Sequence, residues 1–354
     1  MSDAKLRCQW TGMAPRALRE LVDRFGSHEQ VAEAIVRGRT KHSAETRTAV
    51  RVPAEVRREE LTRAGVRWIP DTDPEFPRRL ADRPDRPPGL FLVGELATGS
   101  TFAVVGTRTT SAYGRRLAEA YGAAIAGEGW STVSGLARGV DGAAHRGTVR
   151  AGGHGCAVLG SGVNVLYPAE HRALGNQLVK TGGAIVSEYP LGAEPRPWRF
   201  PPRNRIISGM ADAVIVVEAD VKGGALITAS LALDQGVPVF ATPGDVTRRT
   251  SRGCNLLVRD GAFPALDPEE LIEDLRLLVG APAKRGATAE YEGEHRWLVE
   301  ALVHAHPGTI DNLVLESGRP IGEVVAAVGE LVVAGVLRVD DDIYGTNPNS
   351  GAAK

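Results

Sequence analysis

The chain has 354 residues, a formal net charge of −1 and 43% hydrophobic residues, which is typical of a globular protein with two or three domains. No apolar run approaches the roughly 20 residues that a membrane-spanning helix needs, and residues 1–10 lack the apolar core of a signal peptide. The three cysteines, Cys8, Cys156 and Cys254, lie far apart and form no CxxC pair. We therefore expect a cytoplasmic protein with no membrane association, no disulfide framework and no metal site.

Residues 1–70 predict a small module of short helices, of the SAM-like kind. Apolar residues recur there at helical spacing, at Ala17, Leu18, Leu21, Val22 and Phe25. The segment carries more Lys and Arg than Asp and Glu, whereas residues 290–345 are strongly acidic. The near-neutral net charge of the chain therefore does not exclude a nucleic-acid ligand, because the local electrostatic potential decides which ions a surface attracts.

Residues 71–100 are rich in proline, which fixes φ and removes a backbone donor, so we expect an extended connector with a short strand at Leu90–Val93. From residue 101 to residue 280, apolar β-rich segments alternate with helical patterns. The expected strands are Phe102–Val105, Ser131–Ser134, Gly155–Leu159, Ala184–Val186, Ala213–Val217 and Pro238–Ala241. This alternation predicts a Rossmann-like α/β fold, a doubly wound parallel sheet with helices on both faces.

Residues 281–292 are expected to be a linker, and residues 293–346 a smaller C-terminal domain. Three helical patterns precede two short β-rich segments there, which is the order of a winged helix. Its third helix, Ile321–Val333, contains no Lys or Arg, although a helix in the DNA major groove normally presents basic and amide groups. We interpret the domain as a protein-contact or self-association element, with a duplex-binding regulator as the alternative, and residues 347–354 as a disordered tail.

The first candidate site is the loop Gly106-Thr107-Arg108, which follows an expected strand and precedes a helix. The N–H groups at a helix start attract anions, and an arginine can form paired hydrogen bonds with a phosphate. The GxGxxG dinucleotide fingerprint is absent from this stretch, so we expect no nicotinamide cofactor. Loops of this kind at the ends of parallel strands should meet along one edge of the sheet.

A second candidate site is the segment Phe200–Arg205, predicted as a loop that leads into a helix at Asn204. Phe200 offers an aromatic face on which a base can stack, and Asn204 can hydrogen-bond a backbone or a base edge. Arg203 is predicted to contact the ligand. Arg205 is predicted to be structural, paired with an acid such as Glu218.

A third candidate is the loop Lys222-Gly223-Gly224, which comes before another expected helix. A Gly-Gly turn presents backbone N–H groups to an anion, and Lys222 adds a point charge. We interpret Glu218, at the end of the preceding strand, as an organiser of this region rather than as a catalytic carboxylate. No residue is predicted to be catalytic.

Eight motifs in order resemble those of the DNA-processing protein A (DprA/Smf) family. They read VVGTR, SGLARGVDGAAH, AVLGSGVNVLYP, SEYP, FPPRNRIISG, VVEA, KGGALITA and SRGCNLLVRDGA. The departures are small, since Thr107 stands where the family usually has serine, and Gly223 and Ala225 replace the serines of its KSGSL pattern.

The resemblance implies a non-enzymatic protein that binds single-stranded DNA, forms a homodimer and loads the RecA recombinase during natural transformation. It also implies that Arg108 and the region of Arg203 lie in the strand-binding pocket. The alternative is a nucleotide-processing enzyme of the related "lonely guy" phosphoribohydrolase type, whose PGGxGT loop corresponds to Lys222–Thr228. This chain keeps the glycine turn but lacks the proline and the Gly-Thr ending.

Overall fold

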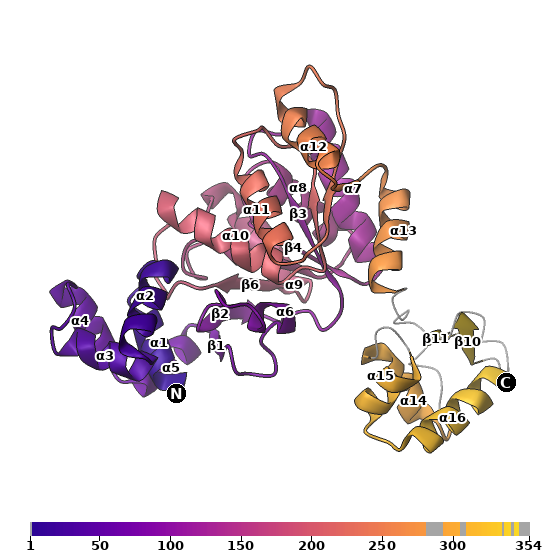
Figure 1. Cartoon of the computed structure of the whole chain (residues 1–354), viewed down its shortest axis with the longest axis horizontal. Coiled ribbons are helices and arrows are strands. Elements are labelled where there is room, and N and C mark those ends of the chain that lie inside the picture. Colours follow the sequence, from indigo (N-terminus) through magenta and orange to yellow (C-terminus); the bar gives the residue numbers. More distant parts are fainter. Residues whose placement is uncertain (1, 281–292, 305–308, 335, 341–342, 347–354) are drawn as a thin grey trace.

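The computed structural model describes residues 2–280, 293–304, 309–334, 336–340 and 343–346 (Figure 1). Its centre is a nine-stranded sheet in the order β1-β2-β6-β5-β4-β3-β7-β8-β9. The strands are β1 (Arg67–Pro70), β2 (Gly89–Gly94), β3 (Thr101–Val105), β4 (Ser131–Ser134), β5 (Gly155–Leu159), β6 (Ala184–Ser187), β7 (Ala213–Val216), β8 (Val239–Ala241) and β9 (Phe263–Pro264). From β6 across to β9 the strands are parallel. The predicted α/β fold with a mostly parallel sheet is therefore confirmed.

Helices cover both faces of this sheet, because successive residues of each buried strand point to opposite sides. Ala103 and Val105 of β3 pack toward α10 (Phe200–Gly209), α11 (Gly224–Asp234) and α12 (Arg249–Arg259). Phe102 and Val104 pack toward the opposite layer. That layer contains α7 (Ala112–Gly127), α8 (Val140–Arg150), α9 (Arg172–Lys180) and α13 (Pro268–Val279).

The chain reverses its direction of winding beside β3. It leaves β3 through β4 and β5 to β6, then returns to the other side of β3 with β7 and continues outward to β8 and β9. Neighbouring strands β3 and β7 therefore define the topological switch point. In open α/β sheets the crevice outside the carboxyl ends of the strands at such a point is where ligands bind.

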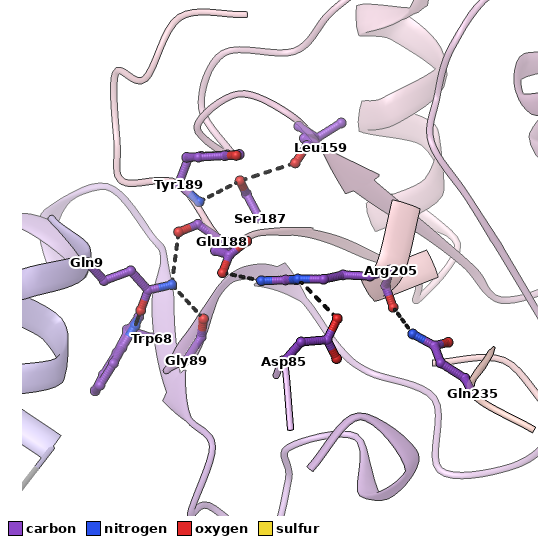
Figure 2. Close-up of polar contacts among 10 residues, drawn as sticks. All are labelled: Gln9, Trp68, Asp85, Gly89, Leu159, Ser187, Glu188, Tyr189, Arg205 and Gln235. Atoms are coloured by element: carbon purple, nitrogen blue, oxygen red, sulfur yellow. Dashed lines mark hydrogen bonds and ion pairs between the residues drawn. The ribbon is translucent and has the colours of Figure 1, made fainter. Parts of the chain in front are cut away.

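The N-terminal region is helical, as predicted. Its helices are α1 (Ser2–Gln9), α2 (Pro15–Phe25), α3 (His28–Val36), α4 (Ala44–Arg51) and α5 (Ala54–Arg63). Figure 2 shows that Gln9, at the end of α1, ties this module to the sheet. Its amide nitrogen donates to the carbonyl oxygens of Gly89 (2.7 Å) and Glu188 (2.8 Å), and its oxygen accepts from Trp68 Nε1 (2.9 Å).

The short strand predicted at Leu90–Val93 within the proline-rich segment is confirmed as β2, and it joins this segment to the sheet. β1 pairs with β2, and β2 pairs with β6, both antiparallel. The short helix α6 (Arg78–Ala81) lies between β1 and β2 in the sequence. Leu90, Phe91 and Leu92 of β2 are fully buried. Apolar burial, rather than the proline content, therefore decides the structure of this segment.

The C-terminal region contains three helices followed by a two-stranded hairpin. Its elements are α14 (Arg296–His304), α15 (Ile310–Ser317), α16 (Ile321–Val333), β10 (Leu337–Asp340) and β11 (Ile343–Thr346). Their order is the expected one, and the assignment as a winged helix stays a prediction. The predicted linker 281–292 and tail 347–354 lie outside the described residues. Among the helices that the structure describes, none has both the length and the apolar character needed to span a membrane.

Candidate nucleic-acid interface

A pocket of about 300 Å³ opens at the carboxyl ends of the central strands. We call it the rim pocket, and its lining consists of Arg108, Tyr167, Pro195, Pro197, Phe200, Pro201, Arg203, Asn204, Gly224 and Ile227. The loop after β3, the loop after β5 and the starts of α10 and α11 all contribute to it. The structure therefore brings together residues from each of the three candidate sites predicted from the sequence.

The ring of Phe200 has an aromatic and a cationic neighbour. The Tyr167 ring centroid is 5.6 Å from that of Phe200 with the planes inclined at 37°, and the guanidinium carbon of Arg108 lies 5.2 Å from the Phe200 centroid. Tyr167 is 40% exposed. Tyr167 is not among the site residues predicted from the sequence, although an aromatic residue in a strand-end loop was the available signal.

Phe200 to Arg205 form the first turns of α10 rather than a loop, which corrects the predicted helix start at Asn204. Pro201 and Pro202 follow the first helical residue, where a missing backbone N–H breaks no helical hydrogen bond. The helix therefore starts four residues earlier than the sequence indicated, and it holds Phe200, Arg203 and Asn204 in fixed relative positions.

Arg203 is predicted as a ligand contact, but the structure buries it to 4% exposure beneath the pocket. Its Nη1 donates to the carbonyl oxygen of Gly135 (2.8 Å) and also to that of Val158, so it joins the ends of β4 and β5. A Cβ at Gly135 would lie 2.4 Å from Arg203, which explains why this position is glycine. Burial lowers the pKa of Arg203 to about 10, with Asp141 opposing the shift, so Arg203 stays charged at neutral pH.

Arg205 is structural, as predicted, but its partner is Glu188 and not Glu218 (Figure 2). The Arg205 Nη2 to Glu188 Oε1 distance is 2.5 Å, and Asp85 Oδ2 lies 3.8 Å from Arg205 Nε. Both Arg205 and Glu188 are buried. Burial raises the pKa of Glu188, while the charge of Arg205 favours its ionised form.

Glu218 organises the loop that carries Arg108. Its Oε2 accepts hydrogen bonds from the Thr110 hydroxyl (2.6 Å) and the Ser111 amide (2.8 Å), and its Oε1 accepts from the Ser111 hydroxyl (2.7 Å). This buried carboxylate therefore lies at the start of α7, where the sequence had suggested a phosphate. The negative charge complements the positive end of the helix dipole.

Gly106 and Thr107 precede Arg108 and are held by contacts with α8 and with the loop after β7. A Cβ at Gly106 would lie 2.4 Å from Val140, and the Thr107 amide donates to the carbonyl oxygen of Glu218 at 2.7 Å. Neither residue lines the rim pocket. Their direct phosphate contacts stay a prediction.

Lys222 and Gly223 immediately precede Gly224, which lines the pocket at the start of α11. Lys222 is exposed. Within the described residues neither Lys222 nor Arg108 has a carboxylate within ion-pair distance, so both charges face solvent. Among those same residues no cluster of His, Cys, Asp and Glu is arranged to hold a metal ion.

Comparison with known sequences identifies related proteins. The family model described as DNA recombination-mediator protein A matches residues 67–276, which is more than half of the chain. Protein Smf of Escherichia coli is 38% identical over 275 residues, covering 75% of this chain and 74% of the relative. DNA processing protein DprA of Bacillus subtilis is 37% identical over 214 residues, covering 60% of this chain and 72% of the relative.

Solved structures show the same fold. DNA processing protein A of Streptococcus pneumoniae matches with a TM-score of 0.63 and 28% identity, over 76% of this chain and 95% of that one. DNA processing protein A of Helicobacter pylori, a structure that describes a single-stranded DNA binding mode, matches with a TM-score of 0.54 and 25% identity. That match covers 59% of this chain and 95% of the Helicobacter chain.

Proposed function

Because this chain belongs to the DNA recombination-mediator protein A family, also called DprA or Smf, we propose that it binds single-stranded DNA in the rim pocket. We propose further that it acts as a homodimer and loads RecA onto the bound strand without catalysing a reaction of its own. The single-stranded DNA binding mode described for the Helicobacter pylori relative supports the choice of ligand. The family resemblance supports the two protein partners.

The observation that carries this proposal is the combination of Phe200, Tyr167 and Arg108 in one pocket. Stacking of a base on an aromatic side chain contributes roughly 1–3 kcal/mol and works with any base. In a duplex the bases already stack on one another and their faces are covered. A pocket that offers aromatic rings therefore favours an unpaired strand.

The backbone of the strand is proposed to follow the cations beside the rings. Arg108 supplies a planar donor group and Lys222 a point charge, while Gly223 and Gly224 let the strand approach the start of α11 closely. Asn204 is available to a base edge or a sugar, since it lines the pocket. Arg203 supports this site from below by fixing the strand ends.

The substitution Arg108→Ala tests the proposal. We expect weaker binding of a single-stranded oligonucleotide in fluorescence anisotropy, and a salt slope reduced by roughly 0.7 for each phosphate that the variant no longer neutralises. Arg138→Ala is the matched control, because Arg138 is exposed on a neighbouring loop but pairs with Glu170 at 2.7 Å. Equal affinities of wild type and Arg108→Ala would contradict the proposed site.

The two protein partners need separate measurements. Analytical ultracentrifugation of the purified chain tests the homodimer, for which a monomer at all concentrations is the contrary result. Co-sedimentation with RecA on single-stranded DNA tests the loading role, with RecA alone as the reference. An unchanged amount of RecA on the strand would contradict loading.

The position of Glu218 supports a binding role over the phosphoribohydrolase alternative. Its carboxylate is buried and accepts hydrogen bonds from Thr110 and Ser111, so it holds a loop instead of facing a substrate. Incubation with mononucleotides followed by chromatography should show no released base. Base release that Glu218→Gln abolishes would establish the enzyme instead.

A further inference from the structure

A second basic surface adjoins the rim pocket at the start of α12. We call it the α12 surface and define it by Arg248, which directly precedes the helix, and Arg252 in its first turns. Both side chains are exposed, and in the described part of the chain neither forms an ion pair. Figure 1 shows α12 at the same end of the sheet as the start of α7.

The loop after β7 joins the rim pocket to this surface without a break. Gly224 lines the pocket, and Lys222 precedes it by two residues. Two residues earlier still, Asp220 pairs with Arg249 of α12, with 3.2 Å between Oδ2 and Nε. A ligand that extends from Gly224 along this loop therefore meets Lys222 and then the start of α12.

Buried contacts hold these loops together. The carboxylate of Glu218 accepts hydrogen bonds from the Ser111 hydroxyl (2.7 Å) on one side and the Thr250 hydroxyl (3.5 Å) on the other. The Gly253 amide donates to the carbonyl oxygen of Ala219 at 2.8 Å. The Arg108 loop, the loop after β7 and α12 thus form one preorganised surface.

The positive charge on this surface is not neutralised by carboxylates in the way that it is at two other exposed arginines of the sheet domain. Arg259, at the far end of α12, pairs with Asp260 at 2.8 Å, and Arg276 pairs with Glu128 at 2.7 Å. By contrast, Arg248 and Arg252 have no such partner among the described residues. Asp245 offsets part of their charge, because Arg248 lies near enough to lower the pKa of its carboxyl, although hydrogen bonds from Thr247 contribute more.

We infer that a single strand bound in the rim pocket continues past Lys222 onto the α12 surface, where Arg248 and Arg252 contact its phosphates. This inference rests on the proposed function and adds a second subsite to it. Phosphate contacts carry no sequence information, so the subsite accepts any sequence. It contributes only to strands long enough to reach it.

The experiment compares a short and a long oligothymidine, of about six and about twenty nucleotides, across the range of site sizes known for single-strand binders. The double variant Arg248→Gln/Arg252→Gln is measured against wild type by fluorescence anisotropy in a salt series. We expect binding of the long strand to weaken by about tenfold near 0.1 M salt and its salt slope to fall by about 1.4. The short strand should bind the variant as it binds wild type.

Arg259→Gln is the control variant, since it removes one positive charge, that of an arginine paired with Asp260, from the other end of α12. Unchanged affinity of the double variant for the long strand would overturn the inference. An equal loss for both strands, or an equal loss in the Arg259→Gln control, would also overturn it, because a general field and not a contact would then be responsible. If wild type binds neither strand, the proposed function itself fails.

Discussion

Arginines in two regions of the molecule have opposite roles. We call the exposed residues around Arg108 the mouth of the rim pocket, and the buried residues Arg203, Arg205 and Glu188 the frame. At the mouth, the exposed Arg108 lies against the ring of Phe200 and forms no ion pair within the described residues, so its N–H groups are available to a ligand. In the frame, the buried Arg203 and Arg205 donate their N–H groups to backbone carbonyls and to Glu188. The difference shows that the partners an arginine already has, and not the motif it belongs to, decide whether it can bind phosphate.

The largest effect is expected in the frame, from Glu188→Ala. This change leaves Arg205 buried without its close partner, which typically costs about 3–5 kcal/mol in the free energy of unfolding. Glu170→Ala breaks the exposed pair with Arg138 and should change the free energy of unfolding far less, because solvent screens this pair. Denaturant unfolding measures the free energy of unfolding of both variants. Similar decreases in the two would contradict the claim that the buried pair matters more than the exposed one.

Stability should also depend on pH, through one buried histidine. His145 of α8 is fully buried, and burial lowers its pKa from 6.5 to about 3. Below pH 6.5 the unfolded chain therefore binds a proton that the folded chain does not. As the pH is lowered from 6.5 toward 3, the free energy of unfolding should therefore fall by up to about 1.4 kcal/mol per pH unit. His145→Asn should flatten that slope in denaturant titrations; identical slopes would show that His145 is not held neutral.

At the mouth, Phe200→Ala is expected to affect binding more than folding. Loss of a stacking platform should weaken single-strand binding by roughly 1–3 kcal/mol, as measured by anisotropy. Trp198→Ala is the control, because Trp198 is a partly exposed aromatic residue close in sequence that does not line the pocket. If the Trp198 variant lost as much affinity as the Phe200 variant, the stacking position would lie outside the rim pocket.

The smallest effect should follow from removing the C-terminal region. Truncation after residue 280 removes α14 to β11, whose third helix carries no Lys or Arg. We expect single-strand affinity to stay within about twofold of the full chain, because the phosphate contacts that we propose all lie before residue 280. Complete loss of binding would favour the duplex-binding regulator that acts through this region.

The sequence was sufficient to predict the sheet and the convergence of its loops. Parallel strands end at one edge, so Arg108, Phe200, Asn204 and Gly224 could be expected to meet there, and the structure places them in one pocket. Their contacts with DNA stay a prediction. In the segment before β3, the strand at Leu90–Val93 could be predicted, whereas β1 and the pairing of both strands with the sheet could not.

The sequence could identify Arg205 as structural, but it could not predict that Arg203 is buried as well, because both lie in a helix with little amphipathic contrast. Which side of α10 faces the ends of β4 and β5 is fixed by packing and not by local pattern. The partner of Arg205 was also misassigned, since Glu188 and Glu218 both end strands and only the strand order brings Glu188 close. Tyr167 was overlooked for the same reason, because its loop reaches Phe200 only in the folded chain.

The central claim is that the rim pocket selects an unpaired strand. The most direct test measures binding of the wild-type chain to one oligonucleotide in single-stranded and in duplex form across a salt series. We predict tighter binding of the single strand at every salt concentration, with a difference that persists at high salt because stacking is not screened. Equal affinities at every salt concentration, or tighter binding of the duplex, would contradict the claim.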